Sequence, residues 1–405
     1  MFNKIVSYDN IRSAYLDIVE KFSIDSKSFR YHGLDNISIQ DRDLNSKELI
    51  DICQKELVEN REIEPALIVS IPKKNNPEKF RDIFIYNIKD RIKAQAIYRV
   101  LLPEFEKVFS KRLFSYRPGK PPYFAAKNFC HRYRKNFSTD KALVLDLENY
   151  SDLIDKNVLY SQLENIFEDR KILDLLKLFI FNKIYKNGKI EAPDIGLVQG
   201  VPLIALFNNL YLTDLDHKYQ KQCSFYIRIG DDIGIFDNNI DKLNKLKLEI
   251  IKDLNIRNLT INNSKLFIGD AKENFSFLGY CFNSGIISLE KSYIKRIIAG
   301  WKSILKYKNY NLSKKKYLLR RIMGHPEKNF NYQFQKIIKD KPQINNSEQI
   351  KKLSEDFFRI LTDFIFGKYS PRNRRLLRKE IEYLKIKSLY NFYLDFHYER
   401  NKRTN

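Results

Sequence analysis

Two adjacent aspartates, Asp231 and Asp232, follow Gly230 between two apolar stretches that favour β-structure. Residues 225–229 and 233–236 are expected to form the arms of a hairpin, and the glycine allows the tight turn between them. Two neighbouring carboxylates repel each other unless a cation lies between or beside them. Aspartate is also common in turns that bind nothing. The pair by itself therefore leaves two interpretations open, a Mg²⁺ site and an ordinary turn.

A third carboxylate, Asp146, stands near the end of an apolar stretch at residues 142–147 that is expected to be a strand. Strand ends and hairpin tips can meet at one edge of a sheet, which would gather Asp146, Asp231 and Asp232 around two metal ions. Two metal ions about 4 Å apart can stabilise both the attacking and the leaving oxygen of a phosphoryl transfer. A second expected hairpin carries Lys73, Lys74, Lys79 and Arg81, cations that suit a triphosphate.

The elements that would position these groups follow from hydrophobic periodicity and turn signals. The N-terminal 60 residues are expected to be mostly helical. The pattern predicts strands at residues 66–71 and 82–86 with a turn at 75–77, helices at 88–110, 153–185, 202–219 and 240–254, and helices rich in Lys and Arg after about residue 290.

Composition favours a folded protein with a polyanionic partner. The chain has 405 residues, is 43% hydrophobic and carries a formal net charge of +23, which suits nucleic acid; an AT-rich genome would also enrich lysine. Its four cysteines, Cys53, Cys130, Cys223 and Cys281, show no CxxC spacing, so we expect a reducing, cytoplasmic location. The most apolar run, residues 175–181, is too short to span a bilayer, and no signal peptide is expected.

Ordered motifs between about residues 66 and 290 resemble the reverse transcriptases of the bacterial group II intron-like lineage. The matching blocks lie at residues 71–74 with Phe80 and Arg81, at Asp90, Arg91 and Gln95, at 115–119, at 144–155, at 196–216, at 226–232, at 262–265 and at 277–280. Each block alone has a plain structural explanation, but their joint order is hard to obtain by chance.

The resemblance implies an α+β right-hand polymerase fold with fingers, an RRM-like antiparallel palm sheet and a helical thumb with the C-terminal region. The domains expected from it are a helical N-terminal extension at 1–62, fingers at 63–135, palm at 136–288, and a basic helical thumb and C-terminal extension at 289–405.

The resemblance also implies roles for individual residues. Asp146 and Asp231, with the Leu147 carbonyl, are expected to bind two Mg²⁺ ions, with Mn²⁺ as an alternative, and Asp232 is expected beside the primer end. The residues expected to contact the nucleotide are Lys73, Arg81, Tyr150, Ser151, Gln199 and Gly200. Lys265 is expected to neutralise or protonate the pyrophosphate leaving group, although it could equally be a solvated surface lysine.

Two departures from the family pattern bear on substrate choice. Ile229 and Gly230 occupy positions of the turn where the family usually has tyrosine and a larger residue. Ser151 occupies the position where the family usually has a Phe or Tyr that excludes a ribose 2′-hydroxyl, and Tyr150 precedes it. A small side chain there weakens steric exclusion, whereas a slight backbone shift would let Tyr150 serve instead.

The expected function is therefore RNA-directed DNA synthesis from dNTPs. No HNH-like or RNase H-like segment is seen after residue 290, and this architecture resembles the "unknown group" reverse transcriptases of anti-phage defence, which work with a structured non-coding RNA template. The partners expected are that RNA and the DNA product, with a homo-oligomer or a second protein subunit left open and no membrane. Two alternatives remain, an RNA polymerase and a non-catalytic RNA-binding or splicing cofactor that keeps a polymerase shell.

Overall fold

The structure is a computed structural model that describes residues 1–24, 32–37, 46–73, 76–305 and 310–404. Lys74 and the side chains of Lys73 and Lys79 lie outside the described part of the chain. The chain divides into two compact units. Unit 1 comprises Met1–Ala125 and Ala142–Ile268, and unit 2 comprises Ala126–Lys141 and Gly269–Asn405.

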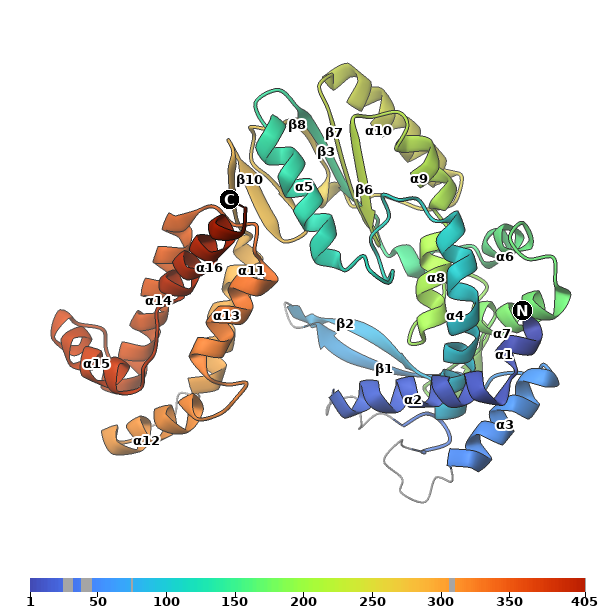
Figure 1. The fold of residues 1–405 in the computed structure, drawn as a ribbon, viewed down its shortest axis with the longest axis horizontal. Coiled ribbons are helices and arrows are strands. Elements are labelled where there is room, and N and C mark those ends of the chain that lie inside the picture. Colours follow the sequence, from blue (N-terminus) through green and yellow to red (C-terminus); the bar gives the residue numbers. More distant parts are fainter. Residues whose placement is uncertain (25–31, 38–45, 74–75, 306–309, 405) are drawn as a thin grey trace. The chain divides into compact units, whose positions relative to one another are not determined.

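Unit 1 combines helices with strands (Figure 1). The α-helices are α1 (Phe2–Ile5), α2 (Tyr8–Ile24), α3 (Ser46–Val58), α4 (Ile88–Val108), α6 (Lys156–Glu164), α7 (Arg170–Ile180), α8 (Pro202–Leu210), α9 (Thr213–Tyr219) and α10 (Ile240–Asn255). Two short 3₁₀ helices, η2 (Tyr150–Asp152) and η3 (Asn263–Lys265), follow strands or loops near the acidic residues.

Two four-stranded sheets contribute the strands of this part of the chain. The first has the order β2-β1-β4-β5, formed by β1 (Ala66–Lys73), β2 (Asn76–Ile85), β4 (Ile184–Lys186) and β5 (Lys189–Glu191). The second has the order β6-β7-β3-β8, formed by β3 (Lys141–Asp146), β6 (Phe225–Ile229), β7 (Asp232–Asp237) and β8 (Phe267–Asp270). The second sheet carries all three aspartates of the predicted site at or beside strand ends.

Two long helices expected from the sequence are interrupted in the structure. The helix predicted at residues 153–185 is two helices, α6 and α7, the second capped by Asp169. It ends before β4, where Ile184 pairs in parallel with Ala66 of β1. The helix predicted at residues 202–219 is divided into α8 and α9. The carbonyl of Tyr211 accepts a hydrogen bond from the Arg257 side chain, and Leu212 leaves helical geometry with φ −113° and ψ 10°. Strand β4 and the break between α8 and α9 both involve partners distant in sequence.

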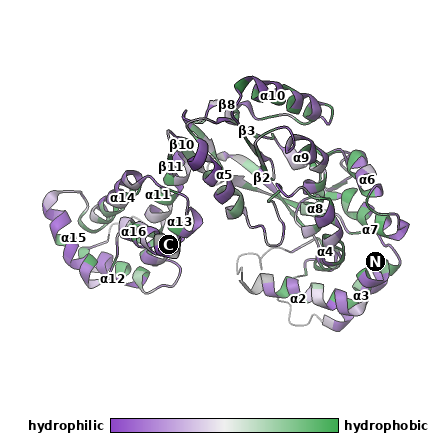
Figure 2. Cartoon of the chain, turned by 45° about the horizontal axis from the view of Figure 1, so that its top comes forward, coloured by the Kyte–Doolittle hydropathy of each residue, from purple (hydrophilic) through white to green (hydrophobic). Residues whose placement is uncertain are grey.

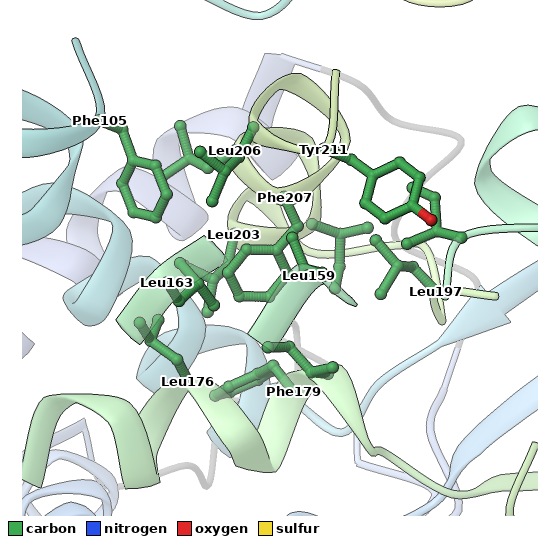
Figure 3. Packing of buried hydrophobic residues seen from close by; sticks show 14 of the residues in the cluster. Phe105, Leu159, Leu163, Leu176, Phe179, Leu197, Leu203, Leu206, Phe207 and Tyr211 are labelled. Carbon is green, nitrogen blue, oxygen red and sulfur yellow. The ribbon is translucent and has the colours of Figure 1, made fainter. Parts of the chain in front are cut away.

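Part of the hydrophobic core of unit 1 lies between α4, α6, α7 and α8 (Figure 3). Phe207 of α8 is fully buried and lies between Leu203 and Leu159 in this view. Phe105 of α4 and Phe167 meet edge to face, with ring centroids 5.6 Å apart, an arrangement favoured by the aromatic quadrupole. This packing anchors α8, and Asn209 near its C-terminal end accepts a hydrogen bond from Arg228 of β6.

Helix α10 has the amphipathic pattern that its sequence predicts. Leu243, Leu246, Ile250 and Leu254 are buried, at the three- and four-residue spacing of one helix face. Asn239 caps the helix by accepting hydrogen bonds from the N–H groups of residues 241 and 242.

Figure 2 shows apolar and hydrophilic colours alternating along the helices. Among the described residues, no helix is both long and apolar enough to cross a membrane.

Unit 2 combines a small antiparallel sheet with helices. The sheet has the order β11-β10-β9, formed by β9 (Phe275–Phe277), β10 (Tyr280–Asn283) and β11 (Ile286–Leu289). The helices are α5 (Pro122–Asn136), most of which belongs to this unit, α11 (Lys291–Leu305), α12 (Leu312–Met323), α13 (Phe330–Asp340), α14 (Ser347–Phe366), α15 (Pro371–Tyr383) and α16 (Leu389–Thr404). Trp301 is buried against Phe334 and Phe357, with edge-to-face rings at 5.7 and 5.1 Å. The helical prediction after residue 290 thus holds for the described residues.

A buried carboxylate closes the open end of the β6–β7 hairpin. Asp237, at the end of β7, is 1% exposed. Its Oδ2 accepts hydrogen bonds from the Ser224 N–H at 3.0 Å and from Lys242 Nζ at 2.8 Å. Its Oδ1 accepts the N–H of Asn239 at 3.3 Å. Burial alone would raise the pKa of Asp237, but these hydrogen bonds lower it below the ordinary value.

Because the folded-state pKa of Asp237 lies below the unfolded value, its ionised form stabilises the fold above about pH 4, and this contribution is lost as pH falls through the folded pKa. We expect Asp237→Asn to lower the unfolding free energy by about 1.5–3 kcal/mol at neutral pH and by progressively less below about pH 4. Urea unfolding across this pH range measures the difference in unfolding free energy between the variant and the wild type. Asp241→Asn, at an exposed position of α10, should change it by less than about 0.5 kcal/mol. If the loss of unfolding free energy in Asp237→Asn does not depend on pH, the ionised Asp237 carboxylate does not stabilise the fold.

Candidate active site

The β6–β7 hairpin has a two-residue turn. Ile229 pairs with Asp232, so Gly230 and Asp231 form the turn. Gly230 has a φ of +63°, a left-handed conformation that glycine adopts without a Cβ penalty and that tight hairpins require. The strand begins at Asp232, one residue earlier than the sequence predicts, so Asp232 lies in the ladder and is half-buried. Asp231 is exposed in the turn.

Asp146 brings the third carboxylate to this turn. Strand β3 lies next to β7 in the sheet, and Asp146 is its last residue and 5% exposed. The N–H of Leu147 donates to the carbonyl oxygen of Asp231 at 3.0 Å, which ties the end of β3 to the turn. Carboxylate oxygens of Asp146, Asp231 and Asp232 lie within 4.8 Å of one another. The structure therefore brings together all three carboxylates that the sequence analysis selected.

The proximity of these groups changes their acidity. Burial, together with the charges of Asp231 and Asp146, raises the pKa of Asp232 to about 7. Partial desolvation and the charge of Asp146 also raise the pKa of Asp231, although Lys265 acts in the opposite direction. Like charges in a poorly solvated site disfavour ionisation. The cluster thus carries more negative charge than its protein surroundings neutralise.

Lys265 is one cation that does reach the cluster. It ends η3, and its Nζ donates to Oδ1 of Asp146 at 2.7 Å while its side chain remains 58% exposed. Partial burial would lower the pKa of Lys265, but the hydrogen bond and the charge of Asp146 raise it. The N–H of Asn262 donates to the Asp146 carbonyl at 2.8 Å, so η3 is fixed to the end of β3. Lys265 is therefore a charged residue of the site, not an isolated surface lysine.

The donor set fits a hard divalent cation. Carboxylate oxygens are the ligands that Mg²⁺ and Mn²⁺ prefer, and a cation would neutralise the charge that raises the pKa values of Asp231 and Asp232. The Leu147 carbonyl, the further ligand that the resemblance implies, directly follows Asp146 in the chain, and its role as a ligand stays a prediction.

Four of the residues expected to contact a nucleotide, Lys73, Arg81, Gln199 and Gly200, are associated with the first sheet. Arg81 is exposed on β2 opposite Ile71, whereas Lys73 is described only by its backbone at the end of β1. Gly200 has a φ of +119°, and a Cβ there would lie 2.6 Å from the Phe84 carbonyl, so only glycine fits against β2. Gln199 precedes it and is half-buried. The glycine thus holds residues 199 and 200 against the strand that carries Arg81.

Tyr150 and Ser151 face different surroundings. Tyr150 is 6% exposed, and its hydroxyl donates to the Asn208 carbonyl at 2.6 Å. Its ring lies 6.5 Å from that of Tyr211 in the core. Ser151 is half-buried, and its hydroxyl donates to Oδ1 of Asn208 at 3.2 Å. Of the two side chains, the small one is the more exposed.

Sequence reasoning missed the polar group beneath the turn. Arg228 of β6 is fully buried and forms a bidentate ion pair with Asp216 of α9, with Nε and Nη2 donating at 2.8 and 2.7 Å. Tyr226 donates to the same carboxylate at 2.8 Å. The signal was present in the sequence, because residues two apart on a strand share a face, and a Tyr and an Arg on one face of an apolar strand indicate a buried acidic partner.

We expect Asp231→Asn to weaken the binding of Mn²⁺ to the nucleic-acid-free protein by at least about tenfold, since even outer-sphere changes cost that much. The same substitution removes repulsion from the cluster, so the metal-free variant should unfold at a higher temperature than the wild type, while the stabilisation that added Mn²⁺ gives should shrink. Calorimetric titration and thermal unfolding measure the two effects.

Asp241→Asn, at an exposed position of α10, is the matched control and should leave both quantities unchanged. Equal Mn²⁺ affinity in the wild type and in Asp231→Asn would show that Asp231 is not a ligand.

Known proteins give three comparisons. Protein YkfC of Escherichia coli K12 is 26% identical over 154 residues, which is 38% of this chain and 40% of that protein; the chain thus spans less than half of this curated relative. The telomerase of Candida albicans, solved with the TWJ fragment of telomeric RNA, is 14% identical with a TM-score of 0.46, over 82% of this chain and 67% of that one. Apo telomerase of Candida tropicalis is 13% identical with a TM-score of 0.48, over 80% of this chain and 65% of that one.

A family match covers the site itself. The sequence model of the family described as "Reverse transcriptase (RNA-dependent DNA polymerase)" matches residues 71–282, which is more than half of the chain and includes Asp146, Asp231, Asp232 and Lys265. The chain therefore belongs to the reverse transcriptase family of RNA-directed DNA polymerases, which are nucleotidyltransferases with an α+β right-hand polymerase fold.

Proposed function

We propose that this protein synthesises DNA on an RNA template by metal-assisted nucleotidyl transfer. The observation that carries the proposal is the convergence of Asp146, Asp231 and Asp232 within 4.8 Å at the end of two adjacent strands, inside the segment that matches the family. Carboxylates with raised pKa values that lie at a strand edge are typical of functional sites and not of stabilising ones.

Each residue of the site has a part in the proposed reaction. Asp146 and Asp231 would hold two Mg²⁺ or Mn²⁺ ions, which stabilise the attacking and leaving oxygens of phosphoryl transfer. Asp232 would lie beside the primer end. Because Asp146 raises the pKa of Lys265, the lysine stays protonated at neutral pH and can give charge or a proton to the pyrophosphate.

The nucleotide would be held by residues of the first sheet and its neighbours. The planar guanidinium of Arg81 can bind two phosphate oxygens at once, and Lys73 would add a second cation. Gln199 and Gly200, fixed against β2 by the absence of a Cβ, would line the pocket for the base and the template.

The domain assignment belongs to the same proposal. Residues 1–62 would form an N-terminal extension, 63–135 the fingers, 136–288 the palm and 289–405 the thumb with its extension. The late helices support an RNA-binding role. The exposed cations of α12 and α15 are Lys314, Arg320, Arg321, Arg372, Arg374, Arg375, Arg378 and Lys379, and exposed Tyr317 and Tyr383 lie among them. Cations attract phosphates and aromatic rings stack on bases.

The finer part of the proposal concerns the template and the biological setting. We propose a group II intron-like, "unknown group" enzyme of anti-phage defence that copies a bound, structured non-coding RNA in the cytoplasm. The order of the sequence motifs and the basic helices after residue 290 support it. Sequencing the RNA and DNA that co-purify with the protein tests this part separately from the chemistry. One recurrent structured RNA together with DNA complementary to it is the expected result, and random cellular RNA contradicts it.

The purified protein, supplied with a primed RNA template, Mg²⁺ and dNTPs, is expected to make DNA. The double variant Asp231→Ala, Asp232→Ala should lose at least about 1,000-fold in rate, because several kcal/mol of transition-state stabilisation disappear. Incorporation of labelled dNTPs with and without EDTA measures both the activity and its metal requirement.

Asp241→Ala is the control for a lost surface carboxylate and should retain full activity. DNA synthesis that survives in the double variant would refute the site. RNA binding without synthesis of any product by the wild type would favour the non-catalytic cofactor. That alternative leaves the clustering of three carboxylates at the site unexplained.

The burial of Tyr150 supports the RNA polymerase alternative. The ring of Tyr150 is buried and its hydroxyl is engaged with Asn208, so Tyr150 is not free to exclude a ribose. The half-buried residue at the expected sugar position is Ser151, whose hydroxyl and the amide of Asn208 could accept or donate to a 2′-hydroxyl. We propose that the site discriminates weakly against ribonucleotides.

Ser151→Phe is accordingly expected to raise the preference for dNTPs over NTPs by at least about tenfold, or 1.4 kcal/mol, since a large ring excludes the 2′-hydroxyl. The ratio of kcat/KM for dATP to that for ATP on one template measures this preference. Ser161→Phe, on an exposed position of α6, should leave the ratio unchanged. An unchanged ratio in Ser151→Phe would remove Ser151 from the sugar pocket.

A further inference from the structure

The turn that carries Asp231 gains no packing from a side chain at position 230. A Cβ built on Gly230 has no atom within 4 Å, so there is open space on the side where a side chain would project. Glycine is also the residue with the most backbone freedom. A two-residue turn with such a residue needs other restraints if Asp231 is to keep a fixed position relative to Asp146.

Hydrogen bonds hold both sides of the Gly230 residue. Its N–H donates to the Ser115 hydroxyl at 2.7 Å, and its carbonyl accepts from Nη1 of Arg228 at 3.1 Å. Two further bonds close a ring of four residues. Asn209 Nδ2 donates to the Ser115 carbonyl at 2.7 Å, and Nη2 of Arg228 donates to the Asn209 carbonyl at 2.9 Å. Three separate segments of the chain thereby meet beneath the turn.

The ring is buried and firmly anchored. Ser115, Asn209 and Arg228 are at most 3% exposed. The guanidinium of Arg228 is fixed by both oxygens of Asp216. Its backbone is fixed as well, because its N–H donates to the Arg112 carbonyl and its own carbonyl accepts the N–H of Phe114, both at 3.0 Å. Phe114 is the neighbour of Ser115, so the loop and the strand are joined at two points.

The energetics do not favour stability as the reason for this arrangement. Burying an ion pair costs desolvation that its attraction barely repays, and well-packed apolar side chains often do as well or better. A guanidinium does offer a rigid fork of five donors with fixed directions. Here one part of the fork binds Asp216 and another reaches the Gly230 carbonyl. The guanidinium group therefore fixes the Gly230 carbonyl relative to the buried Asp216 carboxylate.

We propose that Ser115 and Arg228 are positioning residues that set the place of the Asp231 carboxylate relative to Asp146, and hence the affinity of the site for divalent cations. The inference rests on the proposed use of Asp146 and Asp231 as metal ligands. Neither Ser115 nor Arg228 touches the cation or the substrate. Their effect passes through the Gly230 peptide and through the Asp231 carbonyl, which accepts the N–H of Leu147 beside Asp146.

Ser115→Ala is the most direct test, because it removes the acceptor of the Gly230 N–H and leaves the Ser115 carbonyl in the ring. We expect Mn²⁺ to bind the nucleic-acid-free variant about 10- to 100-fold more weakly, the range found when groups that orient metal ligands are removed. In the polymerase assay kcat at low Mg²⁺ should fall, high Mg²⁺ should restore much of it, and KM for dNTP should change little.

Tyr133→Phe provides a matched control. Tyr133 is fully buried in unit 2, and its hydroxyl accepts the N–H of the turn residue Gly285 at 3.0 Å. Its loss should cost stability of the same order as Ser115→Ala without weakening Mn²⁺ binding. Urea unfolding of both variants establishes that their stabilities are comparable.

Arg228→Lys is the second variant, since it preserves a cation for Asp216 but lacks the fork that also spans to the Gly230 carbonyl. It should fold and bind Mn²⁺ more weakly than the wild type.

Equal Mn²⁺ affinity in the wild type, Ser115→Ala and Arg228→Lys overturns the positioning role and leaves the metal site intact. Equal weakening in Ser115→Ala and Tyr133→Phe also overturns it, because the cause is then general destabilisation. Absence of Mn²⁺ binding in the wild type refutes the metal site itself.

Discussion

Mutual repulsion among three carboxylates is the constraint around which the second sheet of this protein is built. Asp146, Asp231 and Asp232 lie within 4.8 Å of one another, and the pKa of Asp232 rises to about 7 because burial and its neighbours disfavour its charge. No fold gains stability from such a cluster in the absence of a cation. The surrounding structure must therefore supply the free energy and the rigidity that keep the carboxylates together.

The protein meets this constraint with backbone geometry and polar contacts more than with opposite charge. Asp146 and Asp232 occupy adjacent strands, whose ladder fixes their spacing, and the Leu147 N–H ties the turn to the end of β3. Lys265 offsets part of the charge of Asp146 but remains mostly exposed. Enough negative charge is left to attract cations, which is consistent with the proposal that cations complete the site.

Within unit 1, apolar packing holds helix α8 in the core, and hydrogen bonds connect its C-terminal end to the residues beneath the turn. Leu203, Leu206 and Phe207 bury one face of α8 in the core. Asn209, in the last turn of the same helix, joins the ring beneath the turn. The helix thus connects the interior to the site. Gly200, just before α8, fits tightly against Phe84 of β2, so the same short segment also reaches the sheet that carries Arg81.

The sequence by itself determined which residues could do the chemistry, and much of the local structure. Glycine between two apolar stretches predicts the hairpin, the spacing of leucines predicts α10, and the order of the motifs indicates the reverse transcriptase family, which a match over residues 71–282 bears out. These signals are local, since they depend on residue type and on neighbours along the chain.

Only the tertiary structure decided which side chains meet. It buries Tyr150 and leaves Ser151 more exposed. It pairs Arg228 with Asp216. It also divides the helix predicted at residues 202–219 where the Arg257 side chain donates a hydrogen bond to the Tyr211 carbonyl. In each case the partner is contributed by another element of the fold. A hydrogen bond or an ion pair of this kind depends on where two elements are placed in space, and hydrophobic periodicity, which reports only the face that each element buries, does not contain that information.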